Sequence, residues 1–178
     1  MKKIMFSDAF CLTQAVLDGT KTMTRRLIRD NVPLGNWEET EKHLPYKVGE
    51  VVAIAQSYKD IYPNADFEMI DGKFITESAG WNNKMFVKAD LLPHHIKITD
   101  VKVERLQDIS DDDIMREGVW QSYDQKNLFY VSKSIGYALD VAFLSAREAF
   151  TYLIDMVSGE GTWNFNPWVV AYSFELVD

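Results

Sequence analysis

Apolar residues occupy every other position near the end of the chain. They are Trp168, Val170, Tyr172, Phe174 and Leu176, with Val, Ala, Ser and Glu between them. Because successive side chains of a strand point to opposite faces, this spacing predicts a closing strand with one strongly apolar face. The apolar run at 51–55 predicts a buried strand, and alternating β-branched residues at 20–27 predict another.

A fourth strand is predicted at 94–104, where the alternation changes phase. The apolar residues up to Ile98 are at even-numbered positions, and those from Val101 onward are at odd-numbered positions. The change occurs at Thr99-Asp100. A phase change of one residue is typical of a β-bulge, which lets a sheet curve. A hairpin is predicted around Asp71-Gly72, a favoured pair for tight turns.

Three segments begin with a serine and acidic residues and end at a glycine, which is the pattern of a capped helix. They are 7–19, 110–118 and 145–159. The acidic residues 30–45, with two prolines, predict a solvated loop with at most one helical turn. Because strands and helices do not alternate regularly, we expect an α+β fold: a small curved sheet or open β-barrel with flanking helices.

Composition fits one globular domain over residues 1–178. The chain is 47% hydrophobic and has a formal net charge of -8, which disfavours nonspecific binding to long nucleic acid. The single cysteine, Cys11, excludes an internal disulfide and favours a reducing compartment. No long apolar run is present, so we expect a cytoplasmic protein without a membrane partner.

Positive charge is concentrated in one short segment, 19–29. It contains Lys21, Arg25, Arg26 and Arg29 and no acid. One interpretation is an exposed strand whose cations pair with some of the 27 acidic residues. The other is an anion or nucleotide site, because arginine offers a planar fork, lysine a point charge and threonine a hydroxyl.

Neither a metal nor a cofactor is expected. His43, His94 and His95 are not spaced as ligands with one another or with Cys11, and no glycine-rich phosphate loop is present. The segment "GTWNFNPW" at 161–168 has two interpretations. It is an aromatic plug with asparagines holding its turn, or a stacking platform in which Trp163 or Phe165 lies against a base while Asn164 or Asn166 reads the edge of the base.

Four blocks of the sequence together resemble the activating-signal-cointegrator homology (ASCH) domain, a relative of the RNA-binding PUA fold. They are Lys-Thr-x-Thr-x-Arg at 21–26, "YKVGEVVAI" at 46–54, "ITDVKVERLQDISDDDIMREGV" at 98–119 and "AREAFTYLIDMVSGEGTWNFNPWVVAYSFELV" at 146–177. The last block is most similar to long phage- and prophage-associated members. The resemblance implies a PUA-like curved sheet with flanking helices.

The resemblance also implies roles for particular residues. Some small bacterial members are amidohydrolases that remove the acyl group from N-acylated cytidine. On that match Lys21 is the general base, Thr24 the nucleophile and Glu117 the acidic partner. Residues 21 and 24 lie on opposite faces of an ideal strand, so the enzyme interpretation predicts that residues 20–22 are still turning out of the preceding helix.

The chain departs from the small hydrolases in two ways. It has additional segments near 30–45, 59–95 and 120–145, and Ala55-Gln56-Ser57-Tyr58 stands where phage-type relatives usually carry an arginine and an acid. Three functions stay open: a pocket that binds RNA or a modified nucleoside through Arg25 and Arg26, an amidohydrolase, and a phage or mobile-element accessory protein without catalysis.

Overall fold

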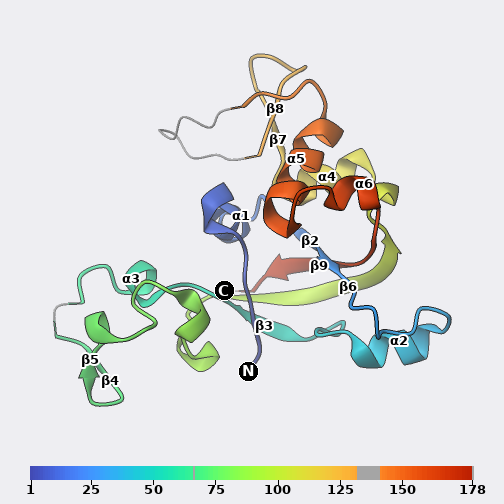
Figure 1. The fold of residues 1–178 in the computed structure, drawn as a ribbon. Coiled ribbons are helices and arrows are strands. Elements are labelled where there is room, and N and C mark those ends of the chain that lie inside the picture. The colour runs from blue at the N-terminus through green and yellow to red at the C-terminus, as the bar shows by residue number, and fades with distance from the viewer. Residues whose placement is uncertain (66, 132–140, 178) are drawn as a thin grey trace.

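A five-stranded mixed sheet forms the centre of the protein, seen in a computed structural model that describes residues 1–65, 67–131 and 141–177 (Figure 1). The strands, in spatial order, are β1 (Lys3–Ile4), β3 (Val51–Ile54), β6 (His95–Arg105), β9 (Trp168–Leu176) and β2 (Met23–Leu27). β1 runs parallel to β3, and the other neighbours are antiparallel. The sheet is curved and does not close in the described part of the chain, which confirms the predicted α+β class.

The helices are short, apart from one of 13 residues. They are α1 (Leu12–Leu17), α2 (Trp37–His43), α3 (Tyr58–Ile61), α4 (Asp111–Arg116), α5 (Ala146–Ser158) and α6 (Thr162–Phe165). The chain also forms 3-10 turns at Asp8–Phe10, Ile75–Glu77, Lys84–Phe86, Ala89–Leu91 and Leu106–Asp108. Helices α1, α4, α5 and α6 lie on one side of the sheet (Figure 1). The main core joins Val16 of α1 and Phe150 of α5 to Ile98 and Tyr172 of the sheet.

The predicted phase change in β6 is confirmed. The pairing of β6 with β9 shifts between Ile98, opposite Phe174, and Asp100, opposite Ser173. This bulge keeps Ile98 and Val101 buried although they are three positions apart, an odd spacing that would put them on opposite faces of a regular strand. The bulge therefore reconciles the sequence pattern with one continuous strand.

The predicted caps of α4 and α5 are also confirmed. The Ser110 hydroxyl accepts from the Asp113 amide at 3.2 Å, and the Ser145 hydroxyl accepts from the Glu148 amide at 3.1 Å. At the first helix the expected serine cap is wrong, because the Ser7 side chain makes no cap hydrogen bond. Cys11 has a φ of 53°, which separates the 3-10 turn from α1.

Two outer segments differ in how well the sequence predicted them. Residues 37–43 form a helix of seven residues, so the expectation of at most one turn in 30–45 is wrong. Asn36 accepts from the Glu39 amide at 3.3 Å, and this cap stabilises a helix that lacks an apolar stripe. The Asp71-Gly72 hairpin is confirmed, between β4 (Met69–Ile70) and β5 (Lys73–Phe74).

The additional segments lie around the sheet. Ile75 and Val87 from the second segment form a small separate core with Tyr58 of α3 and Ala53 of β3. The third segment contains the ladder of β7 (Trp120–Gln121) and β8 (Phe129–Tyr130), while its residues 132–140 lie outside the described residues. None of the described helices has both the length and the apolar character needed to span a bilayer.

Candidate functional site

The chain turns sharply between α1 and β2. The amides of Thr20 and Lys21 both donate to the Ala15 carbonyl, at 2.9 and 2.8 Å, and the strand begins only at Met23. Lys21 therefore precedes the alternation of the strand, and its side chain reaches the same cavity as that of Thr24. The turn at residues 20–22 that the enzyme interpretation requires is present.

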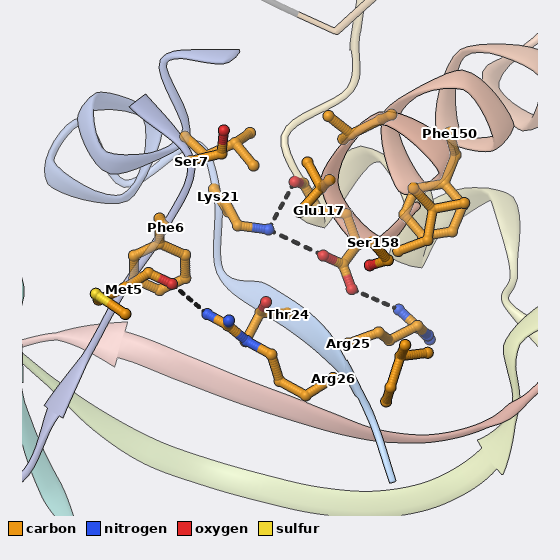
Figure 2. A pocket seen from close by; sticks show the side chains of 15 residues that line it. Met5, Phe6, Ser7, Lys21, Thr24, Arg25, Arg26, Glu117, Phe150 and Ser158 are labelled. Atoms are coloured by element: carbon orange, nitrogen blue, oxygen red, sulfur yellow. Dashed lines mark hydrogen bonds and ion pairs between the residues drawn. The ribbon is translucent and has the colours of Figure 1, made fainter. Parts of the chain in front are cut away.

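This cavity has a volume of about 310 Å³ and lies between β2, the N-terminal segment and α5 (Figure 2). Its polar lining includes Lys21, Thr24, Arg25, Arg26 and Glu117. Its apolar lining includes Phe6, Leu12, Phe150, Leu153, Ile154 and Val157. The structure thus brings the three residues of the proposed catalytic set, together with Arg25 and Arg26 of the basic segment, to one hollow.

Lys21 and Glu117 form a buried ion pair. The Lys21 Nζ donates to Glu117 Oε2 at 2.9 Å, to the Glu117 carbonyl at 2.7 Å and to the Met23 carbonyl at 2.8 Å. The exposed fractions of the two side chains are only 2% and 6%. Burial lowers the pKa of Lys21; the Glu117 carboxylate opposes this effect, and Arg26 and Arg25 add to it.

Arg25 anchors the other oxygen of the Glu117 carboxylate. Its Nη1 donates to Glu117 Oε1 at 3.1 Å, its Nε and Nη2 to Glu104 Oε1 at 2.9 and 2.6 Å, and its Nη2 to Asp113 Oδ2 at 3.0 Å. Burial by itself lowers the pKa of Arg25, but the carboxylates more than offset it and the pKa is raised. All three nitrogens of its guanidinium donate hydrogen bonds within the protein.

Thr24 and Arg26, in contrast, keep unused polar groups. Thr24 is buried as a residue, and its hydroxyl makes no hydrogen bond to any other described residue; the oxygen is not itself fully buried, because it reaches the cavity. Arg26 donates from one Nη to the Met5 carbonyl, and its guanidinium carbon lies 5.8 Å from the centre of the Phe6 ring. Its buried Nε has no partner. Polar groups left unpaired beside a cavity are available to a ligand.

Glu104 and Asp113 belong to the site although the sequence analysis did not identify them. Asp113 lies in the first turn of α4, where an acid is explained by helix capping alone. Glu104 lies on β6 and also contacts Lys102 at 3.2 Å. In the sequence, the excess of cations in 19–29 was the feature that indicated acidic partners from distant parts of the chain.

Trp163, Asn164 and Asn166 do not line the cavity. The Trp163 ring packs edge-on against Phe150, with ring centres 6.1 Å apart, and Asn166 Oδ1 accepts from the Gln107 amide at 2.8 Å. Asn164 is exposed. These contacts are those of the aromatic plug, so the proposals below do not include these three residues. Within the described residues no cluster of His, Cys, Asp and Glu is arranged to hold a metal ion.

No protein-family model matches the chain, and no curated protein matches it. Two solved structures are similar to it at 16% identity and a TM-score of 0.39. One is an ASCH domain from Lactobacillus crispatus JV V101, where the similarity covers 95% of this chain and 72% of that chain. The other is a DUF984 protein from Enterococcus faecalis V583, with 94% and 67% covered.

Proposed function

We propose that the cavity binds a small nucleoside-type ligand. The observation that carries this proposal is the unpaired Thr24 hydroxyl beside a buried ion pair, in a hollow whose opposite wall is apolar. A flat base would pack against Phe150 and Leu153, while its polar edge would meet Thr24. A volume of about 310 Å³ lies at the lower end of small-molecule pockets, which suits one nucleoside.

Binding to a strand of RNA is less well supported by the geometry. Of the four cations in the basic segment, Lys21 and Arg25 are buried in ion pairs. Arg26 is partly buried, and only Arg29 is exposed. Because affinity for a long strand depends on cations that neutralise successive phosphates, this segment offers too few of them.

A second candidate function is hydrolysis of an amide on such a nucleoside, which the resemblance to the ASCH amidohydrolases suggests. The free Thr24 hydroxyl and the lowered pKa of Lys21 favour it. Thr24 Oγ1 would bond to the acyl carbon while its proton passes to the neutral Lys21 amine. The C–N bond then breaks, and that proton leaves with the nucleoside amine. Water hydrolyses the acyl-threonine ester to a carboxylic acid and restores the hydroxyl.

In this scheme Lys21 first loses one proton to solvent, and Glu117 holds the neutral amine in place. The carboxylate lies 2.9 Å from Nζ, within hydrogen-bond distance of the amine. Arg25 fixes the carboxylate through its second oxygen, so the amine is already oriented when the ligand arrives. Lys21 thus acts on the reacting atoms, whereas Arg25 is a positioning residue.

The test uses cytidine and cytidine acetylated on its exocyclic amine. Calorimetry measures binding of both, and chromatography measures release of acetate. We expect Thr24→Ala to abolish turnover. Thr20→Ala should leave turnover unchanged, because the exposed Thr20 hydroxyl donates to the Ala15 carbonyl and does not line the cavity. Binding without turnover would reject the hydrolase and retain the pocket. Absence of both would reject both and favour an accessory protein without catalysis.

A further inference from the structure

Arg25 and Arg26 are adjacent in sequence but differ in how their charge is balanced. Arg25 contacts three carboxylates, those of Glu104, Asp113 and Glu117, at 2.6 to 3.1 Å. Arg26 makes no ion pair with any carboxylate in the described part of the chain. Its one hydrogen-bond acceptor is the neutral carbonyl of Met5, and its buried Nε–H has none.

The surrounding charges compensate Arg26 only in part, because Glu117 favours its charge without pairing with it. The three carboxylates also bind other cations: Lys21 through Glu117, Lys102 through Glu104 and Asp113, and Arg116 through Asp113. These three carboxylates therefore already form ion pairs with four cations, and Arg26 is a fifth cation beside them. A protein with a net charge of -8 holds a local excess of positive charge against the cavity.

A partly buried guanidinium without a counter-ion is costly, because burial removes water without supplying an opposite charge. Consistently, burial is the largest cause of the lowered pKa of Arg26. The Phe6 ring, 5.8 Å from the guanidinium carbon, offers a weak cation–π contact instead of a full charge. The missing counter-ion is the feature that requires an explanation.

We propose that Arg26 binds an anionic oxygen group, a carboxylate or a phosphate, carried by the ligand of this cavity. The inference rests on the proposed nucleoside-type function and specifies its ligand as negatively charged. Arginine is suited to this because its Nε–H and one Nη–H form parallel hydrogen bonds to two oxygens of one anion. Arg26 has its Nε–H unused and lines the cavity.

The anion has two chemical sources, which a set of matched ligands distinguishes. A phosphate would come from the sugar, and cytidine monophosphate is compared with cytidine. A carboxylate would come from the acyl chain, and cytidine carrying a succinyl group on its exocyclic amine is compared with the neutral butanoyl derivative. Calorimetry on the whole protein measures the four dissociation constants for wild type and for Arg26→Gln, Arg26→Lys and Arg29→Gln.

In one of the two pairs we expect wild type to bind the charged ligand at least about tenfold more tightly than its neutral counterpart, as for charge-assisted hydrogen bonds. Arg26→Gln should abolish this preference, and Arg26→Lys should retain part of it. Arg29→Gln removes one exposed charge nearby and should leave the preference intact. Since Arg26 has no carboxylate partner, its replacement leaves no orphaned acid, and thermal unfolding checks that the variants remain folded.

Equal binding of charged and neutral ligands by wild type overturns the inference while leaving the nucleoside pocket in place. The same holds if Arg26→Gln keeps the preference. If none of the four ligands binds, the proposed function fails. Arg26 is then tested separately with inorganic phosphate and with succinate by NMR of the arginine Nε–H signals. The Arg26 signal is identified as the one that is absent from the spectrum of Arg26→Gln. A saturable shift of this signal supports an anion site, and no shift rejects it.

Discussion

The Lys21 ammonium lies 2.9 Å from one oxygen of the Glu117 carboxylate, and the Arg25 guanidinium lies 3.1 Å from the other (Figure 2). Glu117 thus separates two buried cations that are four residues apart in sequence. The two cations are not equivalent. Arg25 has two further carboxylate partners, whereas Lys21 has no second carboxylate partner in the described part of the chain and instead contacts two backbone carbonyls and the Phe6 ring.

Removing Glu117 should destabilise the protein more than removing Lys21. Glu117→Gln leaves two buried cations facing each other, and breaking a buried pair in this way costs about 3–5 kcal/mol. Lys21→Met leaves the carboxylate paired with Arg25 and places an apolar chain of similar length in the core, so we expect a smaller loss. Urea unfolding of both variants measures the difference. Equal losses would mean that Arg25 does not hold Glu117.

Two buried threonines provide a matched test of the free hydroxyl. The Thr13 hydroxyl donates to Asp8 Oδ1 at 2.6 Å, whereas that of Thr24 has no partner in the described residues. Thr13→Val should cost about 1 kcal/mol or more, and Thr24→Val should leave the free energy of unfolding nearly unchanged or raise it. Thr24→Val should nevertheless abolish deacylation. A large loss of stability in Thr24→Val would show that its hydroxyl is structural.

The local features of the fold could be predicted from sequence, because their causes lie within a few residues. The Ser110 and Ser145 caps and the bulge before Asp100 are of this kind. The alternation at 20–27 instead predicted a strand from residue 20, whereas the strand begins at Met23, and only the enzyme interpretation required a turn there. The helix at 37–43 was missed because its stability comes from a cap and terminal charges rather than from an apolar stripe.

The partners within the site could not be predicted from sequence in the same way. Arg25 contacts Glu104, which is 79 residues away, and only the register of β2, β9 and β6 brings them together. The basic segment showed that charge is concentrated here. It did not show that Arg25 is neutralised and Arg26 is not, and this difference gives the two arginines different roles.

If deacylation occurs, its rate should rise with pH through the pKa of Lys21. The amine accepts the Thr24 proton only when neutral, and burial places its pKa below the ordinary value of 10.5. The rate should therefore rise and level off below pH 10.5. Steady-state kinetics across this range measures the profile, with chemical stability of the substrate checked without protein. A rate that is independent of pH up to 10.5 would contradict Lys21 as the base.

Gly118 holds the turn that follows Glu117. It has a φ of +107°, and a Cβ there would lie 2.9 Å from Leu12 Cδ2 and 3.7 Å from Lys21 Cδ. Gly161 also has a positive φ, +84°, but a Cβ there would meet nothing within 4 Å. Each alanine variant should lose about 1–3 kcal/mol through backbone strain.

Gly118→Ala should lose more stability than Gly161→Ala and should also weaken ligand binding, because Leu12 and Lys21 both line the cavity. Thermal unfolding and calorimetry of the two variants measure these effects. Equal effects of the two substitutions on binding would show that the contacts of Gly118 do not shape the cavity.

The most direct test of the nucleoside pocket is an NMR titration of the isotope-labelled protein with cytidine and its acetylated, succinylated and phosphorylated forms. The account predicts saturable shifts of the backbone amides of Lys21, Thr24, Glu117 and Leu153, the residues around the cavity, with Thr162 and Asp71 unchanged. Shifts confined to other surfaces, or no saturable shift with any of these ligands, would contradict it.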